Sequence, residues 1–439
     1  MAFVSLPDLP KGKEFEEYIS AFFQSDGYYI ERNIIEREAE EVLELDIVTT
    51  DYCSSPPEIK LLEVKTGDWG FPDLFKVRGW MDYLNISKGV FIASKVRENS
   101  DFFKKKAKGL NIDLVVISNL SESKDALSEL MNNTTIEDID ISTWRYSYWV
   151  ERNLLKHLNH KKKSHPNKKC FKALDDYYFE VTSGVFFTEN IVKKVCKLYS
   201  TFQKFPHISA KCGNELIGNT FDGEYDTLPE KIYNDTYYKC SYNDIQISTF
   251  IEHRARLAIL KSAIDYKLYK EAGIENKIKD IPLLMISDSV LQSLLDLLPS
   301  SFKEGLDMIS KHKYFHRYPI FWQWFMWIFG GFILKDYEEK EYKTLSQKTG
   351  IPIDEIPNAL ESYQILFPRN DGWFMDLPTS NIKLMKMFPV PFMGIGANYR
   401  RLIYTESQEF KDLKLTGMYT LDDLIKWNNL TVEVLEDKR

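Results

Sequence analysis

The chain has 439 residues, of which 44% are hydrophobic, enough apolar side chain for two or three buried cores. Its formal net charge of −8 argues against a protein that coats nucleic acid through a general basic excess, but it leaves room for an enzyme with one basic cleft. The five cysteines form no CxxC pair and are odd in number, so we expect reduced thiols in a cytoplasmic protein, with no zinc site and no disulfide framework.

The first part of the chain alternates between helical and strand patterns. Residues 12–26 have the apolar spacing of a one-sided helix, and residues 41–50 and 59–66 form two predicted strands joined by a polar turn. The later elements are a helix, a strand, a basic helix and a strand, at 74–84, 89–94, 100–108 and 114–118. This order predicts an α/β domain over residues 1–120, with a mixed sheet flanked by helices.

The remainder is expected to contain a linker and a mainly α region. Residues 121–172 are acidic and then basic, and we interpret them as a linker. Residues 173–439 have mostly helical patterns, which predicts a regulatory or assembly region that binds protein partners or a second copy of the chain. Within it, residues 335–378 have the spacing of a winged-helix-like module, with Gly350 in the turn. Because its second helix is acidic, we expect it to serve packing or protein contact ahead of DNA reading.

One apolar segment, residues 318–334, is almost long enough to span a membrane. It is slightly short for a span and contains Gln323, so the sequence favours a buried core helix and no membrane contact. The N-terminus has neither the basic residues nor the apolar stretch of a secretory signal.

The chemistry-bearing residues lie on the two strands of the predicted hairpin. Residues two apart in a strand share a face, so Glu63 and Lys65 point the same way, and pairing of the strands brings Asp46 beside Glu63. Two carboxylates at that spacing suit Mg²⁺ or Mn²⁺, to which the carbonyl of Val64 can add an oxygen. Lys65 would then stand next to an attacking water and a phosphate. The pattern predicts phosphodiester hydrolysis.

These residues resemble the PD-(D/E)XK nuclease superfamily, in its Mrr-like and Holliday-junction-resolvase-like branches, over residues 11–118. The resemblance rests on a helix glutamate after a glycine, an aromatic turn, an aspartate in an apolar strand and an E-x-K strand: Gly12 to Glu16, Asp26-Gly27-Tyr28, Leu45-Asp46-Ile47-Val48 and Leu62-Glu63-Val64-Lys65. It implies a restriction-endonuclease-like fold, catalytic assistance by Glu16 and DNA as substrate. It also implies an effector of prokaryotic anti-phage or anti-plasmid defence, or of restriction, including nuclease subunits of multi-protein complexes.

Two other functions stay open. The domain could be a catalytically silent subunit that binds nucleic acid or scaffolds a complex, against which the intact set of Asp46, Glu63 and Lys65 argues. It could also be a ribonuclease, because the residues specify only a phosphodiester. For the helix glutamate, Glu17 and an ordinary solvated helix face compete with Glu16.

Several further residues are candidates for nucleic-acid contact. Many relatives carry a glutamine on the helix after E-x-K; here Lys76 or Arg78 would take its place as a phosphate contact. Trp69 could stack on a base or pack against the sheet, with nothing in the sequence to separate the two.

A dense basic run extends over residues 152–172 and includes three consecutive lysines, Lys161, Lys162 and Lys163. It favours DNA contact by a tether near the nuclease-like domain, with a mobile linker as the alternative.

Overall fold

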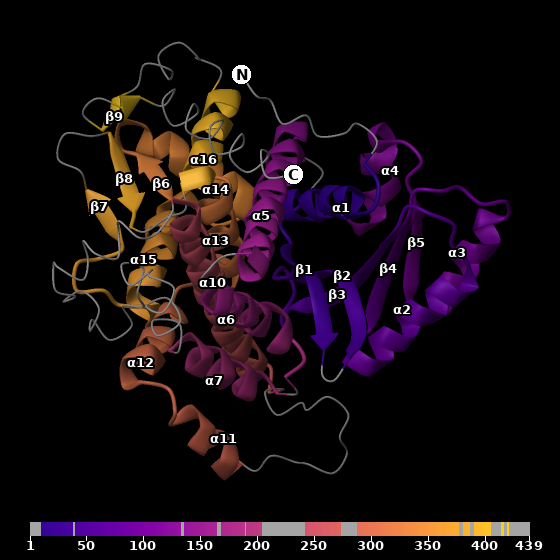
Figure 1. The fold of residues 1–439 in the computed structure, drawn as a ribbon, viewed down its shortest axis with the longest axis horizontal. Coiled ribbons are helices and arrows are strands. Elements are labelled where there is room, and N and C mark those ends of the chain that lie inside the picture. The colour runs from indigo at the N-terminus through magenta and orange to yellow at the C-terminus, as the bar shows by residue number, and fades with distance from the viewer. Residues whose placement is uncertain are drawn as a thin grey trace.

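The computed structural model describes the chain in segments: residues 10–37, 40–132, 136–164, 168–188, 190–203, 242–273, 288–376, 381–386, 390–404, 414–416 and 419–420. Figure 1 shows two parts, a sheet covered by helices at the N-terminal end and a mainly helical remainder. The predicted α/β domain followed by a mainly α region is confirmed at this level.

A five-stranded mixed sheet forms the N-terminal part, in the order β1-β2-β3-β4-β5. The strands are β1 (Tyr29–Arg37), β2 (Glu41–Asp51), β3 (Glu58–Lys65), β4 (Lys88–Ala93) and β5 (Ile112–Val116). The first three run antiparallel, and β3, β4 and β5 run parallel. The predicted hairpin of β2 and β3 is therefore confirmed.

Helices cover both faces of this sheet. The apolar side of α1 (Lys13–Ser25) packs in one core cluster, and α2 (Phe71–Leu84) packs in the other, which α3 (Ser100–Lys108) also joins. The helix α2 starts three residues before the predicted position, because Asp73 caps its first turn by accepting a hydrogen bond from the Gly70 N–H at 2.8 Å. A short helix, α4 (Ser123–Leu127), follows β5.

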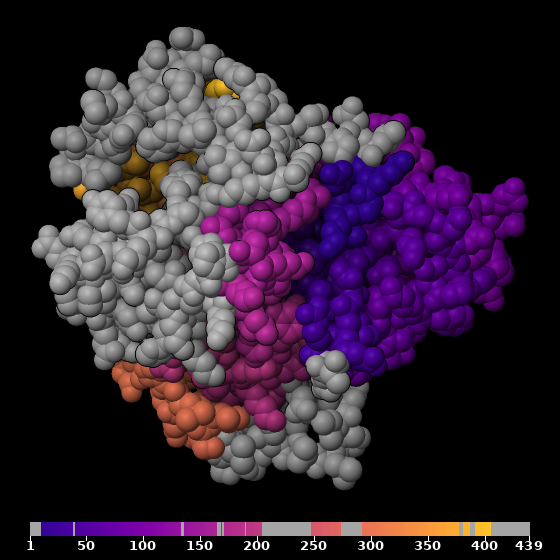
Figure 2. All heavy atoms as spheres, in the orientation of Figure 1, coloured from indigo at the N-terminus to yellow at the C-terminus, as the bar shows by residue number. Residues whose placement is uncertain are grey.

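Most of the predicted linker is helical. Residues Asp138–Ser164 form the long helix α5, which packs against α1, and Lys168–Phe179 form α6 beside it. The buried side chains of α5 recur at helical spacing, at Ile141, Trp144 and Tyr148. In Figure 2 the magenta segment that contains α5 lies directly against the indigo N-terminal part. The expectation of a linker over 121–172 does not hold for these helices, because α5 buries one face against α1.

The helical region contains eight further α-helices among the described residues: α7 (Ile191–Phe202), α10 (Tyr242–Glu271), α11 (Asp288–Leu295), α12 (Ser300–Ile309), α13 (Tyr318–Trp327), α14 (Glu338–Thr349), α15 (Ile356–Leu366) and α16 (Val390–Ile403). Its strands are β6 (Phe332–Leu334), β7 (Phe374–Asp376), β8 (Ile382–Met385), β9 (Lys414–Thr416) and β10 (Tyr419–Thr420). A π-helical turn, Glu180–Gly184, follows α6.

The apolar segment at 318–334 is a core helix, α13, followed by β6, as the sequence favoured over a membrane span. Its polar residue, Gln323, is buried and binds the edge strand β1: the amide group accepts from the Ile30 N–H at 3.3 Å and donates to the Ile30 carbonyl at 3.0 Å. Gln24 of α1 donates to it at 2.6 Å. In the described part of the chain, no helix has both the length and the apolar character needed to cross a bilayer.

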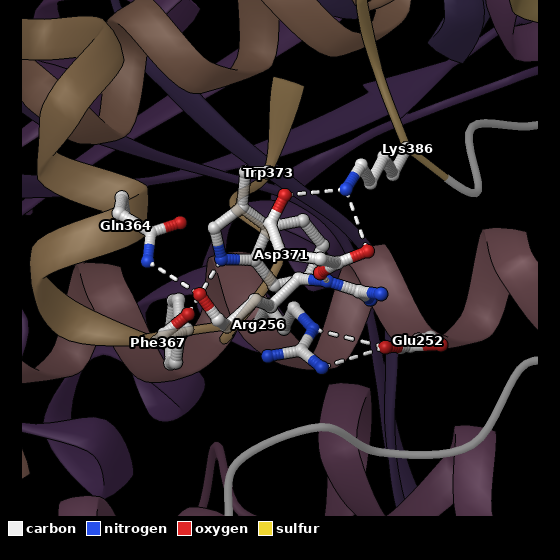
Figure 3. Close-up of polar contacts among 8 residues, drawn as sticks. Glu252, Arg256, Gln364, Phe367, Asp371, Trp373 and Lys386 are labelled. Carbon is white, nitrogen blue, oxygen red and sulfur yellow. Dashed lines mark hydrogen bonds and ion pairs between the residues drawn. The ribbon is translucent and has the colours of Figure 1, made fainter. Parts of the chain in front are cut away.

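A buried cation lies among the aromatic side chains of the helical region. Arg256 on α10 donates to Glu252 one turn earlier at 2.7 Å (Figure 3). Its guanidinium lies 4.5 Å from the ring centre of Trp373 and 4.7 Å from that of Phe202. The Trp373 indole N–H donates to the Phe367 carbonyl at 2.5 Å. These contacts give the guanidinium a carboxylate and π-faces inside the core.

Candidate active site

Asp46 lies where the regular alternation of β2 is interrupted. Leu45 packs in the core cluster under α2 and α3, whereas Ile47 packs in the cluster under α1, although residues two apart in a regular strand share a face. Asn33, which lies between the paired positions on β1, has a left-handed φ of 49°. At this irregularity the Asp46 carboxylate accepts a hydrogen bond from the Val64 N–H at 2.9 Å, so the aspartate is bound to the E-x-K strand.

Glu63 is the buried partner of Asp46 on β3. It is only 4% exposed, and burial together with the nearby Asp46 charge raises its pKa to about 7. Burial also raises the pKa of Asp46. The Lys76 ammonium donates to Glu63 at 3.1 Å and lowers the pKa of both carboxyl groups. The predicted pairing of Asp46 with Glu63 is present. The pKa values of both carboxyl groups stay raised although the Lys76 ammonium lowers them.

The structure separates the two competing helix glutamates. Glu17 is buried against α5 and the sheet, where its carboxylate lies 3.1 Å from Arg152 and 3.8 Å from Arg32. Glu16 is half-buried, and burial, followed by the charge of Asp46, raises its pKa to about 7. Glu16 is therefore the residue within electrostatic range of Asp46, whereas Glu17 is held by arginines.

Lys65 shares the strand face of Glu63, as its spacing predicted. Its charge lowers the pKa of Glu63, and its ammonium donates to Asp73 at 3.2 Å. The side chain of Lys65 keeps 37% of its surface exposed. Sequence reasoning missed Asp73, although its place three residues after Gly70 is the spacing of a helix cap. Asp73 holds the amine near the carboxylates.

Two of the predicted nucleic-acid contacts are structural. Trp69 is 2% exposed, and its indole N–H donates to the Lys95 carbonyl at 2.8 Å while the ring packs on Phe91 and Phe103. It cannot stack on a base, which corrects that alternative in favour of packing on the sheet. Arg78 binds Asp82 one turn along α2 and the carbonyl before β5, so its guanidinium is engaged away from Glu63. Lys76 alone takes the predicted place beside the acids.

The three consecutive lysines do not form a mobile tether. They lie in the last turn of α5, where Lys162 pairs with Asp175 of α6 at 2.6 Å and the Lys161 ammonium lies 5.6 Å from the Phe171 ring centre. Of the three, Lys163 is exposed and the other two are half-buried. Packing of α5 against α6 therefore occupies two of the three residues that the sequence assigned to DNA contact.

The donor set fits a hard divalent cation in part. Among the described segments, no group of three or more His, Cys, Asp or Glu residues is arranged to hold a metal ion. At the candidate site, Asp46 and Glu63 provide the carboxylate oxygens, and the Val64 carbonyl would be a third ligand. Mg²⁺ is commonly bound by one or two carboxylates with water and substrate phosphate as the other ligands, so Asp46 and Glu63 are enough carboxylates for such an ion.

Comparison of this chain with models of protein families, with characterised proteins and with solved structures finds no match.

Proposed function

We propose that the N-terminal part hydrolyses phosphodiester bonds with a divalent metal ion, and that DNA is its substrate. The observation that supports this most is the pair of buried carboxylates, Asp46 and Glu63, whose pKa values are raised by burial and, for Glu63, by its partner. Folding gains nothing from bringing two acids together in a poorly solvated place, whereas a cation between them would offset the cost.

Each side chain has a role in such a reaction. A divalent cation bound here would polarise the phosphodiester and lower the pKa of a bound water. Asp46 and Glu63 would hold that ion. Lys65 orients the attacking water and offsets the charge that develops on the phosphate, from the position in which Asp73 holds its amine. Glu16, with a pKa of about 7, can exchange a proton with water near neutral pH.

Lys76 could bind Glu63 in the free protein and a substrate phosphate during the reaction. Its ammonium binds Glu63 at 3.1 Å and lies 4.1 Å from the Trp80 ring centre, while 47% of the side chain is exposed. A cation on Glu63 would repel this ammonium, which would then be free to meet a substrate phosphate at the mouth of the site.

Nicking of supercoiled plasmid with Mg²⁺ tests the proposal. Lys65→Ala and Asp46→Ala should each slow nicking by about 100-fold or more, whereas Lys88→Ala and Asp113→Asn, on neighbouring strands of the same sheet, should nick like the intact chain. Equal nicking by all five proteins would end the catalytic proposal. Matched DNA and RNA strands of one sequence separate deoxyribonuclease from ribonuclease activity.

A silent, scaffolding domain remains the second candidate. It is favoured by the ion pairs that engage both lysines of the site, Lys65 with Asp73 and Lys76 with Glu63. Addition of Mn²⁺ and of short duplex DNA separates the two. A silent domain would bind DNA without cleaving it, with equal affinity in the intact chain and in Lys65→Ala.

We further propose that the winged-helix-like module predicted at residues 335–378 extends from α13 to β8 and is used for protein contact. Its element order α13-β6-α14-α15-β7-β8 and its sheet order β6-β8-β7 support that topology. The third helix of this segment, α15, exposes Glu361 and buries Ile356, Leu360 and Tyr363, and it has no lysine or arginine to face a DNA groove. A partner protein or a second copy of the chain is the occupant that this surface suits.

A further inference from the structure

A pocket of about 510 Å³ lies between the sheet and the helical region, away from the carboxylates. The sheet contributes the β2–β3 turn, the start of β3 and the end of α2, including Pro57, Ile59 and Ile86. The helical region contributes Lys194 on α7 and Tyr269 on α10, among others. Its volume falls in the range of roughly 300–1,000 Å³ that is typical of small-molecule sites.

The pocket lies at the opposite end of the hairpin from the proposed active site. It contacts the start of β3 near Glu58, whereas Glu63 is five residues further along, a distance of roughly 16 Å at about 3.3 Å per residue. In Figure 1 this is the end of the sheet nearest to α7. The pocket is thus a separate site.

One ammonium in its lining is poorly compensated. Lys194 is close enough to Glu31 and Asp265 to feel both charges, but the two carboxylates are bound elsewhere. The Lys261 ammonium lies 2.7 Å from Asp265 and 3.6 Å from Glu31, and the Tyr52 hydroxyl donates to Asp265 at 2.7 Å. Among the described residues, no carboxylate forms an ion pair with Lys194.

Burial lowers the pKa of Lys194, as expected for an amine that lacks a counter-ion. Among the described lining residues Glu58 is the one acid, and it does not change this balance because it pairs with Lys88 at 2.6 Å and with Lys60 at 3.4 Å. The pocket therefore offers a positive charge to whatever enters it, and it would repel a metal cation.

Most of the remaining lining is apolar or aromatic, with Ser54, Asn85, Ser87 and Thr188 as its polar residues. Phe186 packs beside the Lys194 ammonium, 5.2 Å from its ring centre, and Tyr269 supplies a second ring. Pro57, Ile59 and Ile86 provide the apolar wall on the sheet side.

We propose that this pocket binds a small organic anion with a planar ring, whose acidic group pairs with Lys194 and whose ring packs between the aromatic and aliphatic walls. The anion replaces the counter-ion that Glu31 and Asp265 do not provide. Such a ligand contacts the sheet and the helical region at once, so it stabilises their association.

Titration with 8-anilinonaphthalene-1-sulfonate tests the site, because this probe joins a sulfonate to planar rings and fluoresces when buried. The full chain should bind one equivalent. Lys194→Met should weaken binding by about tenfold or more, the size expected for loss of a charge-assisted contact. Lys194→Arg should keep most of the affinity. The control is Lys197→Met, one turn along α7, where the ammonium already pairs with Glu180 at 2.8 Å, and it should bind as the intact chain does.

A pocket-filling variant keeps the test decisive if Lys194→Met fails to fold. Ile191→Trp places an indole in the pocket and leaves the ammonium in place, and it should abolish the one-equivalent signal while thermal unfolding stays cooperative. Equal affinities in the intact chain, Lys194→Met and Ile191→Trp would overturn the proposal, whatever the number of equivalents bound. None of these readouts depends on nuclease activity.

Discussion

Two places in this molecule bury carboxylates in opposite ways. Glu341 in the helical region is fully buried, as is its partner Arg400, whose guanidinium donates to both carboxylate oxygens at 2.5–2.9 Å and to three backbone carbonyls. The Tyr404 hydroxyl donates to the same carboxylate at 2.7 Å. Asp46 and Glu63 instead lie side by side, with raised pKa values. The first arrangement satisfies its charge, and the second leaves charge for a cation to satisfy.

Breaking the satisfied pair should have the largest effect. Arg400→Met leaves Glu341 buried without its cation, so we expect a loss of about 3–5 kcal/mol in the free energy of unfolding, measured in urea. Nicking per folded molecule should stay unchanged. A drop in activity with full stability would contradict this difference between the two regions.

Removing one charge from the pair of Asp46 and Glu63 should lower activity and leave stability intact, the reverse of Arg400→Met. Glu63→Gln should reduce nicking by about 100- to 1,000-fold, equivalent to about 2.7–4 kcal/mol of transition-state stabilisation. The metal-free protein should unfold at the same temperature or higher, because one of two repelling acids is gone. Differential scanning fluorimetry in EDTA measures the unfolding temperature. A marked drop in that temperature for Glu63→Gln would contradict the prediction.

The helix glutamates offer a matched pair with a smaller effect. Glu16→Gln should slow nicking by about tenfold, since a proton-exchanging group at the edge of the site contributes less than a metal ligand. Glu17→Gln should leave nicking per folded molecule unchanged and should lower stability, because Arg152 and Arg32 lose their counter-ion. The reverse pattern would return the assignment to Glu17.

The smallest expected effect is on the pH dependence of stability. Glu63 has a pKa of about 7 in the fold, above the ordinary 4.5, so the folded state holds an extra proton between these values. Stability of the metal-free chain should therefore fall as pH rises from 5 to 8. We expect a difference of about 2–4 °C in the melting temperature from this group. Glu63→Gln should make the slope shallower while the part due to Glu16 is retained, and equal slopes in both proteins would argue against the raised pKa of Glu63.

The sequence predicted the element order of the sheet domain because its signals are local. Alternation of apolar residues marks β2 and β3, and the spacing of Glu63 and Lys65 puts them on one face whatever surrounds them. The pairing of Asp46 with Glu63 followed from the hairpin. The choice of Glu16 over Glu17 did not follow from the hairpin, because it depends on Arg152 of α5, which lies far along the chain and pairs with Glu17.

The errors arose where tertiary contacts override composition. For Trp69 the sequence left stacking on a base and packing against the sheet equally open, and burial of the ring is possible because the Lys95 carbonyl accepts from its indole N–H. The helix α5 was missed because its lysines suggested a solvated tether, although Ile141, Trp144 and Tyr148 carry a helical period. The pocket around Lys194 joins residues from distant segments, so no local pattern announces it.

Binding of Mn²⁺ to the metal-free chain, followed by isothermal titration calorimetry at pH 7.5, tests the central claim most directly. We expect one site that is lost in Asp46→Asn and in Glu63→Gln and is retained in Glu17→Gln. Mn²⁺ binding that is unchanged by both Asp46→Asn and Glu63→Gln would contradict it.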